Sequence, residues 1–102
     1  MTEVELQQIE QWGAWMESKG YSRTQFGDYM SYDTDVVLKL DPSTPSWEAY
    51  LFITDNDRVT AKASTPKEAM RLCLVEAERE LLNLEKDSSD RRAKYLQEIS
   101  NL

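Results

Sequence analysis

The sequence predicts an α+β fold with the element order helix, three strands, helix and helical tail. Three observations predict it. Apolar residues recur at helical spacing near both ends of the chain, and they alternate with polar residues across the middle. The stretch from Ala63 to Ala69 joins the two kinds of pattern, because it ends a strand-like run and begins the longest helical pattern. Short connections make the strands an antiparallel meander, and one apolar stripe on each long helix places both helices on one sheet face, giving a two-layer α-β-β-β-α sandwich.

Length and composition favour a single domain over residues 1–102, with a core formed by 1–86 and a helical tail formed by 87–102. The chain has 102 residues, an apolar fraction of 40% and three tryptophans, which is enough for one hydrophobic core. We find no secretory leader and no run of about 18 apolar residues that would span a membrane. We therefore expect a cytoplasmic protein that makes no membrane contact.

The first helix is expected over residues 3–19. Thr2 can cap it, because Glu5 follows three residues later in the pattern of a capping box. Lys19-Gly20 ends it, since Gly20 can adopt the left-handed conformation that follows a helix.

Residues 21–35 are expected to form an ordered loop with a short helical turn near residues 23–29, because polar residues interrupt every period. Asp28, Asp33 and Asp35 suggest calcium, but their spacing lacks the Asp-x-Asp-x-Asp-Gly frame and closing Glu of an EF-hand loop. We interpret these acids as solvated, and we expect no metal site.

Three strands are expected over residues 35–40, 47–54 and 59–64, separated by turn-rich sequence at 41–46 and 55–58. Their alternation divides them into two faces. The face packed under the helices is predicted to carry Val36, Leu38, Leu40, Trp47, Ala49, Leu51, Ile53, Val59, Ala61 and Ala63. The opposite face is predicted to carry Val37, Lys39, Tyr50, Phe52, Thr60 and Lys62.

The second helix is expected to begin at Pro66 with Thr65 as its cap and Glu68 completing a capping box. Cys73 lies in its apolar stripe, which extends to Leu84, and is expected to be a buried structural thiol. The sequence 87–90 then interrupts the pattern. Two alternatives remain open, a separate final helix capped by Ser88 or Ser89, and one long helix that continues to the end.

The composition argues against an enzyme. Histidine is absent, which removes the commonest general base and metal ligand. Cys73 is the only cysteine, and no glycine-rich phosphate loop is present. We therefore expect a non-enzymatic protein with no cofactor.

Residues 36–77 resemble the small α/β sandwich domains of bacteriophage accessory proteins. The resemblance rests on the strand that begins Trp47-Glu48-Ala49-Tyr50 and on the third strand, which runs through Ala61-Lys62-Ala63 into Thr65-Pro66-Lys67-Glu68-Ala69. It implies a viral or prophage origin, and therefore the cytoplasm of a host cell, and it carries no catalytic residues with it. The element order also resembles a double-stranded-RNA-binding domain, but Lys67 and Arg71 flank Glu68 where such domains have a basic cluster.

Two binding functions remain. In the first, the protein inhibits a host defence protein, or links host or phage proteins, by docking on a basic surface through its acidic loops, as the net charge of −7 favours. The candidate residues are Asp28, Asp33, Asp35, Asp55 and Asp57.

In the second, the open sheet face binds a ligand, a nucleotide, a nucleic acid or a second copy of the chain. The candidate residues are Lys39, Tyr50, Phe52 and Lys62. Aromatic side chains between lysines can stack bases, whereas the net charge of −7 opposes nucleic acid. Coverage of this face by the C-terminal helix would remove the site.

Overall fold

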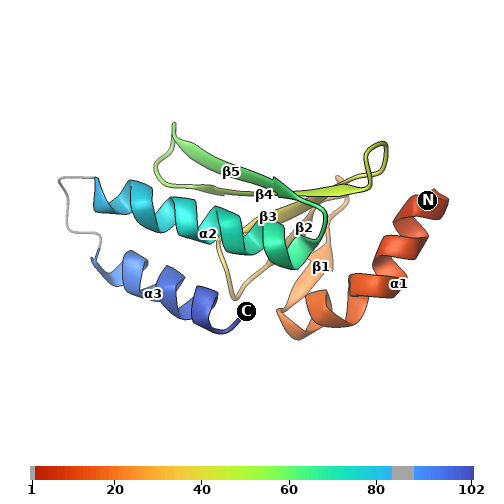
Figure 1. Ribbon diagram of the computed structural model, residues 1–102, viewed down its shortest axis with the longest axis horizontal. Coiled ribbons are helices and arrows are strands. Elements are labelled where there is room, and N and C mark those ends of the chain that lie inside the picture. The colour runs from red at the N-terminus through yellow and green to blue at the C-terminus, as the bar shows by residue number, and fades with distance from the viewer. Residues whose placement is uncertain (1, 84–88) are drawn as a thin grey trace.

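The computed structural model describes residues 2–83 and 89–102, and its elements form one sheet with helices beside it (Figure 1). In the described part, the order is α1 (Glu3–Ser18), β1 (Tyr21–Arg23), β2 (Tyr29–Ser31), β3 (Val37–Asp41), β4 (Ser46–Phe52), β5 (Arg58–Ala63), α2 (Pro66–Leu82) and α3 (Ser89–Ser100). The strands form one antiparallel sheet in the order β1-β2-β3-β4-β5. The α+β class is confirmed, and each strand pairs with its neighbours in sequence.

The sheet has five strands, so the prediction of three strands is wrong. The predicted loop with a helical turn at 23–29 is instead a hairpin of β1 and β2, with Tyr21 opposite Ser31. The Thr24 amide donates to the Asp28 carbonyl over 2.7 Å, and Gly27 adopts a φ of 88° that closes the turn. Each strand has only three residues, which is too short for an alternating pattern to be recognised.

The three strands predicted from alternation are β3, β4 and β5, with bounds that differ by one or two residues. Leu38 lies opposite Ala49, and Ala49 lies opposite Ala61, so residues of one predicted face are cross-strand neighbours. Every residue predicted for the packed face is buried or packs against the buried core. The division of the sheet into two faces is therefore confirmed.

All three helices lie on the same side of the sheet (Figure 1). Helix α2 packs across β3, β4 and β5, and its buried residues include Ala69, Cys73 and Ala77. Helix α1 contacts β1 and reaches β4 through the Trp47 indole N–H, which donates to Gln8 Oε1 over 2.8 Å. The helix layer therefore covers one face and leaves the other without a helix in the described part of the chain.

The predicted helix caps form. Thr2 Oγ1 accepts from the Glu5 amide and Thr65 Oγ1 accepts from the Glu68 amide, both over 3.2 Å. Gly20 follows α1 with a φ of 78°, as expected for a left-handed position. The Glu68 carboxylate binds the guanidinium of Arg71, so it does not complete the capping box.

The C-terminal part is a separate helix and not a continuation of α2. Helix α2 ends at Leu82, and α3 packs against it, so the alternative of one long helix is wrong. Tyr95 of α3 is fully buried and joins the same core as Trp47. The predictions for Leu84 and for a cap at Ser88 lie outside the described residues.

Candidate functional site

The outer face of the sheet, opposite the helices, carries a row of side chains across neighbouring strands. Val37, Tyr50 and Thr60 are successive cross-strand partners on β3, β4 and β5. Because Tyr29 pairs with Leu38, the next position places Met30 beside Val37. This row therefore extends from β2 to β5.

An aromatic pair and two charged groups form the centre of this face. The rings of Tyr50 and Phe52 meet edge to face with centroids 6.2 Å apart, and the Arg58 guanidinium lies 5.2 Å from the Tyr50 centroid. The Tyr50 hydroxyl donates to Asp28 Oδ2 over 3.5 Å. We call Asp28, Tyr50, Phe52 and Arg58 the outer-face cluster. Partial burial and then the Asp28 carboxylate raise the pKa of Tyr50, so its phenol is protonated at neutral pH.

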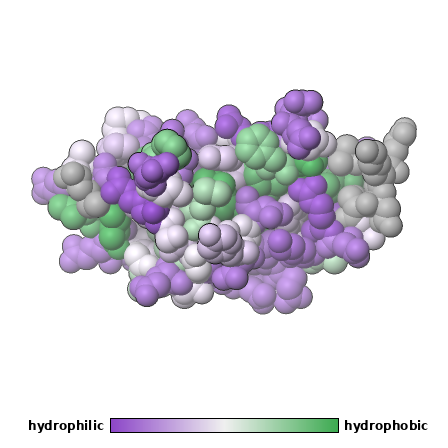
Figure 2. Space-filling model, turned by 180° about the vertical axis from the view of Figure 1, so that it is seen from behind, coloured by the Kyte–Doolittle hydropathy of each residue, from purple (hydrophilic) through white to green (hydrophobic). Residues whose placement is uncertain are grey.

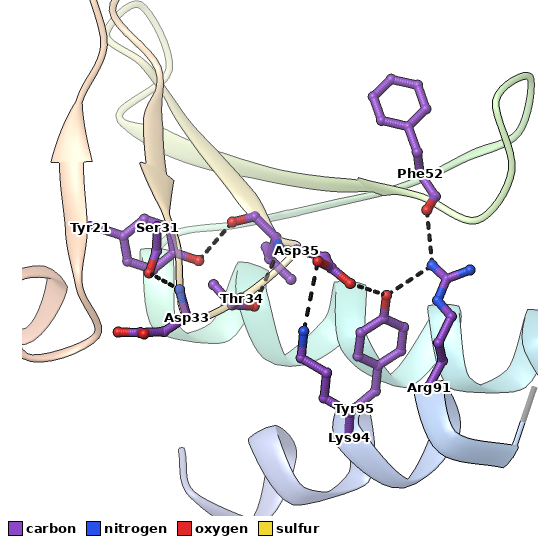
Figure 3. Close-up of polar contacts among 10 residues, drawn as sticks. Tyr21, Ser31, Asp33, Thr34, Asp35, Phe52, Arg91, Lys94 and Tyr95 are labelled. Atoms are coloured by element: carbon purple, nitrogen blue, oxygen red, sulfur yellow. Dashed lines mark hydrogen bonds and ion pairs between the residues drawn. The ribbon is translucent and has the colours of Figure 1, made fainter.

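Phe52 is the exposed member of this cluster. Its side chain is 55% exposed, and it points away from the helix layer (Figure 3). Seen from behind, the molecule shows hydrophobic residues in several separate places on a mainly hydrophilic surface (Figure 2). On the outer face, Met30 is a second large apolar residue that is exposed, at 51%.

The predicted lysines lie on the same outer face, beside the cluster. Lys39 lies opposite Glu48, and Glu48 lies opposite Lys62 on the next strand. Lys62 Nζ is 3.8 Å from Glu48 Oε2, and both lysines are solvent-exposed. The structure therefore places all of the residues predicted for this face together. It also shows that α3 lies on the helix side, so the alternative in which the C-terminal helix covers the outer face is wrong.

The predicted acidic residues lie at two opposite ends of the sheet. In an antiparallel meander, alternate connections lie at the same end. The β2–β3 and β4–β5 connections share one end and carry Asp33, Asp35, Asp55 and Asp57, whereas Asp28 lies in the β1–β2 connection at the other. The five acids therefore do not form one surface.

Several of these acids have structural contacts. Asp35 Oδ2 accepts from the Tyr95 hydroxyl over 2.7 Å, and Lys94 Nζ lies 3.8 Å from Asp35 Oδ1 (Figure 3). Asp57 Oδ2 accepts from Thr54 Oγ1 over 3.2 Å within the β4–β5 turn. These contacts hold Asp35 and Asp57 in place within the fold, and Asp55 takes part in neither of them.

Arg91 of α3 binds the end of β4, a contact that sequence reasoning missed. Its guanidinium donates to the carbonyl oxygens of Ile53 and Phe52 over 2.9 and 3.0 Å, and to the Tyr95 hydroxyl over 3.0 Å (Figure 3). The two carbonyl partners are 38 and 39 residues away in sequence, so no local pattern indicates them. Arg58 was also missed, although extending the β5 alternation back by one residue places it on the outer face.

The described residues hold no group of three histidine, cysteine, aspartate or glutamate side chains that could bind a metal ion. Cys73 is fully buried, with its Sγ 3.8 Å from the Val59 carbonyl oxygen, and burial raises the pKa of its thiol to about 12. None of the helices in the described ranges combines the length and apolar character needed to span a membrane.

Comparisons with protein-family models, with curated proteins and with solved structures find no match to this chain. The geometry and chemistry of the outer face therefore carry the functional proposal.

Proposed function

We propose that this chain is a non-enzymatic protein-binding module that docks through the outer face of its sheet. The observation that carries the proposal is the outer-face cluster, in which an exposed Phe52 ring packs against Tyr50 and the Arg58 guanidinium lies over the Tyr50 ring. Aromatic residues and arginine are enriched at the centres of protein interfaces, because an aromatic ring buries a large area with few rotatable bonds and a guanidinium offers several hydrogen-bond donors. Because these side chains already contact one another in the free protein, they lose less conformational entropy when a partner binds.

The charges around the cluster indicate the chemistry of the partner surface. Lys39, Arg58 and Lys62 lie on the outer face, with Glu48 between the two lysines. A protein surface with an apolar recess for Phe52 and carboxylates at its rim complements this arrangement. A long polyanion is a weaker candidate, because the net charge of −7 repels it at a distance.

The resemblance to bacteriophage accessory domains extends this proposal to a biological role. In that role the module inhibits or links host or phage proteins, with a defence protein of the host as the target class. The rival mode, docking of Asp33, Asp55 and their neighbours on a basic partner, is favoured by the position of four acids at one end of the sheet.

A binding experiment separates the two modes. The partner is captured from host lysate on the immobilised protein, and the mass and stoichiometry of the complex are measured in solution. We expect Phe52→Ala to weaken binding by on the order of 2 kcal/mol, about thirtyfold, because it removes the aromatic anchor. Tyr32→Ala is the matched control, since Tyr32 is fully exposed and lies outside the cluster.

Charge reversal tests the rival mode in the same assay. If the acidic end makes the contact, the double variant Asp55→Lys and Asp57→Lys slows association, and the wild-type on-rate falls steeply with salt. Full binding by Phe52→Ala together with that salt dependence would reject the outer face. A protein that is dimeric alone and monomeric as Phe52→Ala would instead assign the face to a second copy.

A further inference from the structure

Strand β5 forms a free edge of the sheet, because β4 is its one strand neighbour in the described part of the chain. The Ile53 amide donates to the Asp57 carbonyl over 2.9 Å, so these two residues form a hydrogen-bonded pair. In an antiparallel ladder every second pair is of this kind, so the register of β4 and β5 shows which residues of β5 bond to β4. Val59, Ala61 and Ala63 therefore direct their backbone groups at β4. The backbone N–H and C=O groups of Arg58, Thr60 and Lys62 point to the open side.

A groove of about 470 Å³ runs beside this edge, between β5 and α2. Ile53 and Val59 supply its apolar lining, and Glu76 and Glu80 approach from α2, where they are one turn apart. Asp57 and Arg58 lie at the end where β5 begins. The groove thus combines unpaired backbone groups, an apolar floor and a wall of carboxylates.

We propose that β5 accepts an extended basic peptide as a sixth strand, with its basic side chains in the groove. Addition of a strand satisfies the free backbone groups of the edge, while the pockets beside it select side chains. The stems of lysine or arginine can pack on Ile53 and Val59 while their charged ends reach Glu76 and Glu80. Arg79, 3.4 Å from Glu76, offsets part of this charge, and Glu80 remains as the second carboxylate on the same side.

Charge also argues against a second copy of the chain as the added strand. If two β5 edges paired antiparallel about a two-fold axis, Glu76 and Glu80 of both copies would border the same junction and repel one another. A basic peptide removes this repulsion. The edge shares Arg58 with the outer-face cluster, but it presents backbone groups and the groove on the helix side and not the rings of Tyr50 and Phe52. Failure of this inference therefore leaves the outer-face proposal in place, and the reverse also holds.

The test uses two fluorescein-labelled hexapeptides, one alternating lysine with valine and one alternating glutamate with valine, added to the full chain. Six residues match the length of β5. We expect the basic peptide to bind at least ~10-fold more tightly than the acidic one. On binding, the backbone amide resonances of Arg58, Thr60 and Lys62 should shift and gain protection from hydrogen exchange.

Two sets of variants separate backbone pairing from charge. Thr60→Pro removes one outward N–H at an edge position that tolerates proline, and should weaken the basic peptide ~10-fold or more, while Thr60→Val retains binding. The double variant Glu76→Lys and Glu80→Lys should reverse the preference between the peptides, and it remains informative if the proline variant fails to fold. The double variant Glu10→Lys and Glu17→Lys on α1 is the matched control.

Several results would overturn the inference. They are equal binding of both peptides, no binding of either at millimolar concentration, unchanged preference in the double variant of α2, and amide shifts confined to other elements. Dimerisation of the free chain with protection of the β5 amides would assign the edge to a second copy instead.

Discussion

Removal of the Tyr95 hydroxyl should loosen α3 from the end of the sheet. In the folded protein, this hydroxyl donates to Asp35 over 2.7 Å and accepts from Arg91 over 3.0 Å, and the side chain is fully buried. Hydrogen bonds to charged groups contribute about 1.5–3 kcal/mol. The Asp35 side chain is 48% exposed, so water can replace part of the bond. We therefore expect Tyr95→Phe to lower the free energy of unfolding by about 1.5 kcal/mol, the lower end of that range.

Equilibrium urea unfolding, followed by tryptophan fluorescence, measures this change. Tyr32→Phe is the control, because Tyr32 is fully exposed, and we expect it to leave the midpoint unchanged. A double-mutant cycle of Tyr95→Phe with Asp35→Asn should give a coupling free energy of about 1 kcal/mol. Unfolding of Tyr95→Phe at the wild-type midpoint would refute the reasoning. Burial and the bond to Asp35 raise the pKa of Tyr95 to about 12, so Asp35→Asn should also shift its ultraviolet titration to lower pH.

Three further predictions follow from the helices. Thr65→Ala should cost about 1 kcal/mol of unfolding free energy in the same denaturation assay, because the Glu68 amide loses its cap; an unchanged midpoint would contradict this. Cys73 should react with a thiol reagent only in denaturant, since its thiol is buried and protonated at neutral pH, and fast labelling of the native protein would be inconsistent with the fold. Burial raises the pKa of Glu98 above its ordinary value of 4.5, and its Oε2 is buried without a hydrogen-bond partner among the described residues. Stability from this group is present below pH 4.5 and is lost as the pH rises through the folded-state pKa, so Glu98→Gln should gain stability relative to wild type toward neutral pH; parallel pH profiles of the two would oppose this.

Alternation over the middle of the chain predicted the sheet correctly where strands were long enough to show it. Trp47 to Ile53 alternates over seven positions, and every second residue is buried, namely Trp47, Ala49, Leu51 and Ile53. β1 and β2 were missed because tertiary packing, and not a local period, makes them strands. The Tyr21 hydroxyl in β1, for example, donates to the carbonyl oxygen of Val36 over 2.9 Å, and Val36 lies in the connection between β2 and β3.

The candidate site could be predicted in part for the same reason. Tyr50 and Phe52 were assigned to the outer face because a residue's face follows from its place in the alternation. The separation of Asp28 from Asp33 and Asp35 depends on which end of the sheet each connection occupies, and that required the two missed strands. The contact of Asp35 with Tyr95 joins residues about 60 positions apart, beyond the reach of any local pattern.

The end of β4 contacts α3 on the helix side of the sheet and exposes a side chain on the outer face. The Phe52 carbonyl oxygen accepts a hydrogen bond from Arg91 in the helix layer, whereas the Phe52 ring points toward the solvent (Figure 3). The backbone at the base of this ring is therefore held by a guanidinium from the helix layer. Fraying of α3 would release the carbonyl groups of Phe52 and Ile53 together and loosen the end of β4 that carries the ring. The last helix thus holds the backbone of a residue whose side chain lies on the opposite surface of the sheet.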